Sequence, residues 1–229
     1  MTTKQKTKIH ELFEFDHTHK QDYEYIIGTD EAGRGPGAGP VFAAAVCFTQ
    51  INDALFEKLA ILNDSKQLSE KHREELYEII KENCIYKIQQ GTVEDIEKMN
   101  ILNTSLECMR ISCIDVENRL NSPKCLVLVD GNKKIKNFNK PQITVIKGDS
   151  KSAAIAAASI LAKVERDRFM KNLSVEYPQY GWEQNKGYLT ASHVEAIKKY
   201  GPTKWHRAKF LRKILGDSEE KTSQLALFS

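Results

Sequence analysis

The sequence has neither a long apolar segment nor a close pair of cysteines. None of its uninterrupted apolar runs approaches the roughly 18 residues that a membrane-spanning helix needs. Its five cysteines are odd in number and irregularly spaced, which favours reduced thiols over a disulfide framework or a zinc site. The first 20 residues contain no apolar core of the kind that secretory signals have. These absences predict a cytoplasmic protein that is not associated with a membrane.

Net charge is low as well, and no internal repeat is present. The 229 residues carry a net charge of only +3 although 28% of them are charged. Overall charge therefore gives no sign of a nucleic-acid partner, and only local clustering of charge can. The length and the 41% hydrophobic content suit one globular domain, or one domain with a small appendage. Nothing in the pattern indicates oligomerisation, so a monomer is expected.

Short apolar runs alternate with amphipathic segments along the chain. The predicted strands are Tyr25–Gly28, Val41–Phe48, Ile85–Gln90, Leu126–Val129 and Ile143–Lys147. Predicted helices follow Ser69, open at a capping box formed by Thr104 and Glu107, and cover Ser152–Asn172, Thr190–Tyr200 and Thr203–Leu215. This alternation indicates an α/β fold with a mixed sheet that starts antiparallel and continues with parallel strands.

Carboxylates follow three of the predicted strands. Asp30 and Glu31 come after YIIGT, Asp130 comes after CLVLV, and Asp149 comes after ITVIKG. Ligands bind at the carboxyl edge of α/β sheets, so these acids are expected near one another. Divalent cations would relieve their repulsion, and carboxylate oxygens favour Mg²⁺ or Mn²⁺ over zinc. The alternative is that each acid only caps a turn or lies at a solvated loop end.

Two neighbouring cations could activate a water molecule and steady the leaving oxygen of a phosphodiester. The sequence contains no convincing Ser/His/Asp or Cys/His arrangement for a covalent mechanism. Basic runs at 133–147 and 198–213 contain no acid, and aromatic residues accompany the second run, so a polyanionic substrate is indicated. A solvated helical face is the alternative explanation of the second run.

Glycine is concentrated immediately after the first acids, in the stretch AGRGPGAGP. This stretch matches neither the dinucleotide-binding nor the P-loop pattern. Glycine allows the backbone to approach a ligand closely, and exposed N–H groups can then bond phosphate or hydroxyl oxygens. A tight turn with small-residue packing is the alternative.

Together these segments resemble bacterial ribonuclease HII, of the type 2 RNase H family, from about Ile27 to Phe210. The resemblance is carried by GTDEAGRGPGAGPV, NDSKQLS, VLVDGN, VIKGDSKSAAIAAASILAKVERDR, YPQYGWEQNKGYLT and HRAKF, in this order. It implies an RNase H-like five-stranded mixed sheet flanked by helices, with a helical C-terminal region and a flexible tail. The implied segments are an N-terminal extension over 1–22, helical in part, a catalytic core over 23–185, a helical substrate-binding region over 186–215, and a disordered tail over 216–229.

The resemblance also implies the site and the reaction. The protein would hydrolyse the RNA strand of RNA/DNA hybrids and cut 5′ to ribonucleotides embedded in duplex DNA, leaving a 3′-OH and a 5′-phosphate. Such cutting would serve ribonucleotide removal in DNA repair and replication. The implied residues are Asp30, Glu31, Asp130 and Asp149 as catalytic metal ligands for Mn²⁺ or Mg²⁺, Gly33, Arg34 and Gly35 as the backbone that reads a 2′-OH, Tyr188 stacking on the next deoxyribose, and Lys66, Ser150, Lys151 and Ser152 near phosphate.

For some positions the sequence leaves two interpretations open. His206 and Arg207 are candidates for phosphate contacts or for packing, and Tyr188 could instead be a core tyrosine. The peptide QLALF near the C-terminus is similar to the short peptide with which bacterial repair proteins dock on the sliding clamp, through Gln224, Leu225, Leu227 and Phe228. The alternative is a tail that folds back on the body.

Other functions remain open from the residues alone. A resolvase or transposase-type endonuclease would share the acids but cut all-DNA substrates. A binding module without catalysis would keep the charges and the clamp peptide. A phosphatase with similar metal chemistry would have no use for the basic runs.

Overall fold

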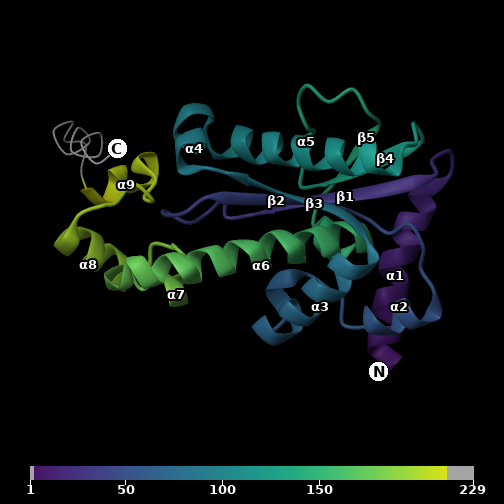
Figure 1. Cartoon of the computed structure of the whole chain (residues 1–229), viewed down its shortest axis with the longest axis horizontal. Coiled ribbons are helices and arrows are strands. Elements are labelled where there is room, and N and C mark those ends of the chain that lie inside the picture. The colour runs from purple at the N-terminus through teal and green to yellow at the C-terminus, as the bar shows by residue number, and fades with distance from the viewer. Residues whose placement is uncertain (1–2, 216–229) are drawn as a thin grey trace. The chain divides into compact units, whose positions relative to one another are not determined.

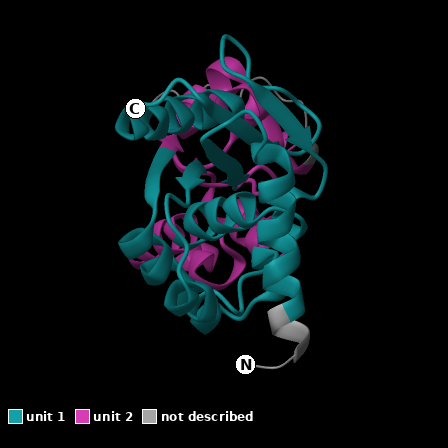
Figure 2. Cartoon of the chain, turned by 90° about the vertical axis from the view of Figure 1, so that its right-hand side faces the viewer, with its two compact units in different colours: residues 1–32, 42–89, 105–164 teal, residues 33–41, 90–104, 165–229 magenta. Residues whose placement is uncertain are grey.

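The computed structural model describes residues 3–215, so the predicted clamp peptide lies outside the described part of the chain. The chain forms two compact units (Figure 2). Unit 1 consists of residues 1–32, 42–89 and 105–164, and unit 2 of residues 33–41, 90–104 and 165–229. The predicted α/β class is confirmed, because unit 1 is built on a mixed sheet flanked by helices. The predicted domain division of the chain stays a proposal.

The sheet has five strands in the order β3-β2-β1-β4-β5. The antiparallel start is the pair of β1 and β2, and the parallel part joins β1 to β4 and β4 to β5, as the alternation predicts. The strands are β1 Tyr25–Ala32, β2 Val41–Cys47, β3 Ile85–Gly91, β4 Cys125–Asp130 and β5 Gln142–Val145.

Strand β1 extends four residues beyond its predicted end. Asp30 and Glu31 therefore lie within the strand, opposite Ala44 and Ala43 of β2, and the prediction that they follow the strand end was wrong. Gly28 does not terminate the strand. A Cβ atom on Gly28 would lie 2.2 Å from the carbonyl carbon of Ala154, so this glycine lets a helix pack closely on β1.

Helices cover both faces of the sheet in unit 1. The unit 1 parts of α5 Ile101–Leu120 and α6 Ala153–Glu176 lie on opposite faces (Figure 1). The remaining helices of this unit are α1 Thr3–Lys20, α2 Asp53–Lys58, α3 Glu70–Asn83 and the 3₁₀ turns η1 Ser65–Gln67 and η2 Gly148–Ser150. Helix α3 follows Ser69 as predicted, and the Ser69 hydroxyl caps it by accepting from the His72 N–H at 3.2 Å. Across residues 3–215, no helix is long and apolar enough to span a membrane.

The predicted capping box at Thr104 is wrong. Helix α5 already begins at Ile101, and the Thr104 hydroxyl donates to the Asn100 carbonyl at 2.9 Å inside the helix. The capping box of this region is formed by Thr92 and Asp95, at the start of α4 Val93–Met99. Thr104 and Glu107 have the spacing of a capping box, but Thr92 and Asp95, twelve residues earlier, form the capping box of this region.

Unit 2 has its own apolar core around Met170, Trp182, Ile197 and Leu211. Its other elements are η3 Pro178–Tyr180, α7 Trp182–Asn185, α8 Ala191–Tyr200 and α9 Ala208–Leu215. The last helix starts five residues later than predicted. The reason is that the segment before it pairs with the loop after β1: His206 bridges Ala38, and the Arg207 N–H donates to the Gly37 carbonyl at 2.8 Å.

Candidate functional site

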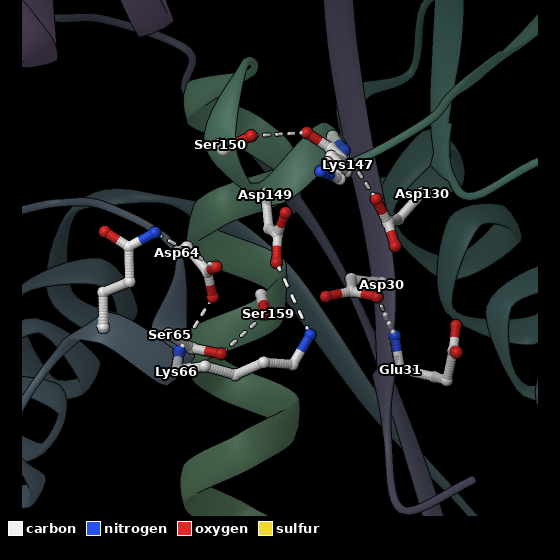
Figure 3. A network of polar contacts seen from close by, with 12 residues as sticks. Asp30, Glu31, Asp64, Ser65, Lys66, Asp130, Lys147, Asp149, Ser150 and Ser159 are labelled. Carbon is white, nitrogen blue, oxygen red and sulfur yellow. Dashed lines mark hydrogen bonds and ion pairs between the residues drawn. The ribbon is translucent and has the colours of Figure 1, made fainter.

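The four predicted acids gather at the carboxyl edge of the sheet in unit 1 (Figure 3). Asp30 and Glu31 stand on β1, Asp130 is the last residue of β4, and Asp149 lies in η2, which follows β5. Strands β1, β4 and β5 are parallel neighbours, so their carboxyl ends meet at this edge. Sequence positions up to 119 residues apart thus supply one patch of carboxylates.

Burial and mutual repulsion make this patch electrostatically unfavourable. Asp30 is only 6% exposed, and its pKa is raised well above the usual range by burial first and then by Glu31 and Asp130, while a hydrogen bond from Ser159 lowers it. Burial, Asp64 and Asp130 raise the pKa of Asp149 in the same way. Lys66 lowers the pKa of Asp149, but burial and the other carboxylates outweigh it, so the negative charge of the patch is only partly balanced by its surroundings.

Two of the acids bond to backbone N–H groups. Asp30 Oδ1 accepts from the N–H of Glu31 at 2.7 Å, and Asp130 Oδ1 accepts from the N–H of Gly148 at 2.6 Å. No three His, Cys, Asp or Glu side chains within residues 3–215 are arranged to hold a metal ion as they stand. The donor set nevertheless fits Mg²⁺ or Mn²⁺, because it is all carboxylate and a divalent cation would relieve its repulsion. A cation would have to compete with the two backbone hydrogen bonds.

A fifth carboxylate, Asp64, belongs to the same patch and was missed from the sequence. It lies in η1's N-cap position, where Oδ1 accepts from the Lys66 N–H at 2.8 Å, and it raises the pKa of Asp149. Ser159 of α6 was missed too, and its hydroxyl lies 3.0 Å from that of Ser65. For Asp64, the sequence signal was the Asn-Asp-Ser order in NDSKQLS, which is typical of a turn capped by a side chain.

Lys66 reaches the edge of the patch from η1. Its Nζ lies 3.8 Å from Asp149 Oδ2, and the side chain is largely exposed. Burial would lower the pKa of Lys66, but the neighbouring carboxylates, Asp149 foremost, raise it. The ammonium is thus held in its charged form beside the acids and remains accessible to an anion.

The three predicted residues after Asp149 differ in accessibility. Lys151 is exposed, and the Ser150 hydroxyl donates to the Lys147 carbonyl at 2.9 Å. Ser152 is fully buried, and its hydroxyl accepts from the Ile155 N–H at 3.1 Å. The prediction of a phosphate contact for the Ser152 side chain is therefore wrong: it caps the first turn of α6.

The glycine-rich loop, residues 33–40, belongs to unit 2 and is bonded from behind by Arg207. The Arg207 side chain is fully buried, so the predicted phosphate contact is wrong and the packing alternative holds. Its guanidinium donates to the carbonyl oxygens of Gly33 at 2.7 Å, Arg34 at 3.3 Å, Pro36 at 2.8 Å, Gly39 at 2.9 Å and Pro40 at 3.2 Å.

His206 is likewise buried and bonds inside unit 2. Its Nδ1 accepts from the Thr203 N–H at 2.9 Å, which leaves the proton of the neutral ring on Nε2, 3.2 Å from His193 Nε2. His193 Nε2 also accepts from Trp182 Nε1 at 3.0 Å. Burial, together with His193, lowers the pKa of His206 to about 3. The neutral pair is a packing element, and the phosphate contact predicted for His206 is wrong.

Tyr188 has the exposure that a ligand-stacking residue needs. Its side chain is 49% exposed, so the core alternative is excluded. The ring borders the glycine-rich loop, because a Cβ on Gly35 would lie 3.4 Å from Tyr188 Cε1. The Tyr188 carbonyl accepts from His193 Nδ1 at 2.9 Å, which ties the tyrosine backbone to the buried histidine pair.

The mixed sheet and its carboxylate edge define an α/β protein of the RNase H type. Residues 27–213 match the family model described as Ribonuclease HII, and the chain belongs to that family. Its members are endonucleases that hydrolyse the RNA of RNA/DNA hybrids.

Proteins that are similar in sequence and proteins that are similar in structure both include ribonucleases HII. The chain is 51% identical over 202 residues to a ribonuclease HII of Fusobacterium nucleatum, covering 88% of this chain and 92% of the relative. It is 45% identical over 213 residues to a ribonuclease HII of Clostridium perfringens, covering 93% of this chain and 75% of the relative. Among solved structures, the RNase HII of a PCNA:RNase HII complex from Archaeoglobus fulgidus superposes with a TM-score of 0.64 at 28% identity, covering 81% of this chain and 95% of that one.

Proposed function

We propose that the protein is a divalent-metal-dependent endonuclease that cuts duplex DNA on the 5′ side of an embedded ribonucleotide and also cuts the RNA strand of hybrids. The products are a 3′-OH and a 5′-phosphate. The observation that carries the proposal is the patch of carboxylates at the carboxyl edge of the sheet, where burial and neighbouring acids raise the pKa values of Asp30 and Asp149, in a member of the ribonuclease HII family. The chemistry takes place in the cytoplasm during ribonucleotide removal.

The acids are the candidates for holding the metal. Asp30, Glu31, Asp130 and Asp149 would bind Mn²⁺ or Mg²⁺, which supplies activation of water and stabilisation of the leaving oxygen. Lys66, with its ammonium beside Asp149 and its side chain exposed, binds the phosphate of the substrate. Ser150 and the exposed Lys151 follow Asp149 directly in the chain and contact the neighbouring phosphate.

The glycine-rich loop and Tyr188 provide recognition. Gly33, Arg34 and Gly35 present backbone N–H groups to the 2′-OH, which is the group that distinguishes RNA from DNA. The exposed ring of Tyr188 stacks on the sugar of the following deoxyribonucleotide. The loop begins two residues after Glu31 in the chain, so recognition and chemistry are encoded in one continuous segment.

The first test is a cleavage assay on an end-labelled DNA duplex that carries one ribonucleotide. We expect one cut, 5′ to the ribonucleotide, in Mn²⁺ or Mg²⁺ and none in EDTA or in an all-DNA duplex. Cutting only of long RNA in a hybrid would remove junction recognition from the proposal. Cutting of all-DNA duplex would favour a resolvase-type enzyme, and no cutting of any substrate would favour a binding module.

We also propose that the C-terminal peptide binds a sliding clamp, through Gln224, Leu225, Leu227 and Phe228. Support comes from the related archaeal RNase HII, whose structure was solved in a complex with PCNA. A pull-down with purified clamp should recover the full chain but not a chain that lacks its last six residues. The double variant Leu227→Ala, Phe228→Ala should behave like the truncation, and Ser229→Ala like the full chain. Equal recovery of all four would refute clamp binding.

A further inference from the structure

Two buried arginines donate hydrogen bonds to backbone carbonyls of the glycine-rich loop. Arg207 donates to five loop carbonyls, as described above. Arg166 of α6 is 1% exposed and donates to the carbonyls of Pro40 at 3.2 Å, Ala38 at 3.1 Å and Lys186 at 2.9 Å. Burial, followed for Arg207 by the charge of Arg166, lowers the pKa of Arg207 to about 9, and burial lowers that of Arg166 to about 10, so both stay cationic at neutral pH.

The loop needs such support because it has few side chains of its own. Gly33, Gly35, Gly37 and Gly39 alternate along it, and glycine loses more conformational freedom on folding than any other residue. Two of them also make room for buried side chains that pack against the loop. A Cβ on Gly33 would lie 2.3 Å from Arg166 Nε, and one on Gly39 would lie 2.3 Å from Met170 Sδ. The bare backbone that can approach a ligand on one side is therefore packed tightly on the other.

The hydrogen bonds of Arg207 also determine where the loop's N–H groups point. No peptide bond in the described residues is cis, so each N–H points opposite to the carbonyl of the preceding residue. The carbonyls of Gly33 and Arg34 point at Arg207. The N–H groups of Arg34 and Gly35 therefore point away from Arg207. A Cβ on Gly35 would lie 3.4 Å from the exposed ring of Tyr188.

We propose that Arg207, assisted by Arg166, is a positioning residue for ribose recognition: it holds the carbonyls of Gly33 and Arg34 inward so that the N–H groups of Arg34 and Gly35 are preset to meet a 2′-OH. The inference rests on the proposed function of this loop. Arginine is required in this role because one planar guanidinium can serve five carbonyls, whereas a lysine ammonium has only three donors at one point.

The test compares Arg207→Lys and Arg166→Lys with the wild-type chain and with Arg119→Lys. Arg119 is the matched control, since it also donates to a backbone carbonyl, that of Tyr86 at 2.8 Å, but is exposed and lies in unit 1. For each protein, kcat and KM are measured on duplexes that carry one ribonucleotide or one 2′-deoxy-2′-fluoro nucleotide at the same position, per folded molecule. Hydrogen exchange of residues 33–40 is measured without substrate.

We expect Arg207→Lys to reduce the preference for the ribonucleotide by about tenfold or more, because a site built to bond a hydroxyl discriminates through that bond. Arg166→Lys should have a smaller effect in the same direction, and Arg119→Lys none. Exchange of residues 33–40 should accelerate in Arg207→Lys while that of β4 stays unchanged.

A fall in rate that is equal for both substrates, with unchanged exchange in the loop, would overturn the proposal. If the wild-type chain does not cut at the ribonucleotide at all, the proposed function fails, and the exchange data still decide whether Arg207 orders the loop. If Arg207→Lys does not fold, Arg166→Lys decides: unchanged preference and unchanged loop exchange would refute the role of the arginine pair.

Discussion

The carboxylate patch of unit 1 and the arginine pair of unit 2 both bury charge, but they balance it in different ways. Arg166 and Arg207 meet the partial negative charges of backbone carbonyls, so both stay cationic at neutral pH although burial lowers their pKa values. Asp30 and Asp149 meet other carboxylates, and their pKa values are raised by burial and by these neighbours. A buried charge that the fold satisfies is a structural support, whereas a cluster that the fold leaves unbalanced indicates a ligand of opposite charge.

Removing a charge should therefore change the free energy of unfolding in opposite directions in the two regions. Neutralising an acid should relieve repulsion and stabilise the fold while it destroys activity. Removing an arginine should leave carbonyls without donors and destabilise the fold.

Asp30→Asn should lower the rate of cleavage at a ribonucleotide by more than about 100-fold, because residues that only support metal ligands already cost 10–100-fold. Affinity for the duplex should change little, and the free energy of unfolding should rise since a buried, repelled charge is removed. Cleavage, duplex binding and thermal unfolding are measured together. Asp115→Asn, at a partly exposed acid of α5 outside the patch, is the control. Loss of binding in step with cleavage would argue against a metal-ligand role for Asp30.

Arg207→Met should lower the free energy of unfolding by about 3–5 kcal/mol, because several buried carbonyls lose their donor at once. The matching change at the exposed Arg119 should cost less than about 0.5 kcal/mol. Denaturant titration of both variants measures the difference. Equal stabilities would show that the buried guanidinium does not support the loop.

The glycines of the two regions should also differ. Gly28→Ala should cost about 3 kcal/mol or more, because its Cβ would lie 2.2 Å from backbone atoms of α6. Gly35→Ala meets only the Tyr188 ring, at 3.4 Å, and should cost less than about 1 kcal/mol while it weakens ribonucleotide cleavage. Unfolding and cleavage measured on both variants separate the packing glycine from the recognition glycine. A destabilised Gly35→Ala would contradict this assignment.

Asp16 offers the effect that depends most on pH. It joins α1 to the start of α6, with Oδ2 accepting from the Ala154 N–H at 2.9 Å, and burial raises its pKa from 3.8 to about 6. The folded chain binds the proton more tightly than the unfolded chain does, so stability from this group is present below pH 4 and is lost as the pH rises to 6.

Asp16→Asn should therefore gain stability relative to the wild type between pH 4 and pH 7, by up to about 3 kcal/mol. Thermal unfolding of both proteins across this range measures the difference. A difference that does not change with pH would show that Asp16 is not protonated in the fold.

The acids were predictable from the sequence because each follows a short apolar run that reads as a strand. Neither Asp64 nor Ser159 follows a strand. The sequence of NDSKQLS could have indicated the turn at Asp64, but only the packing of η1 and α6 brings Asp64 and Ser159 to the patch. The end of β1 was misplaced because Gly28 has the appearance of a strand terminator, whereas its function is to admit a helix backbone.

Arg207 shows a limit of a different kind. A basic run in the sequence shows that positive charge is present but not which groups the side chains contact. The partners of Arg207 are backbone carbonyls about 170 residues earlier in the chain, and because every residue has a carbonyl, the sequence does not mark them. The same holds for His206, whose partners are another histidine and a backbone N–H. For both residues, the sequence therefore left a phosphate contact and packing open as alternatives.

The central claim is that the carboxylate patch is completed by a divalent cation, and thermal unfolding with and without Mn²⁺ tests it most directly. The melting temperature of the wild type should rise by several degrees at saturating Mn²⁺, since a ligand bound only by the folded state stabilises it, and EDTA should reverse the rise. Asp30→Asn should start from a higher melting temperature and respond little. An equal rise in both proteins, or no rise in the wild type, would contradict the account.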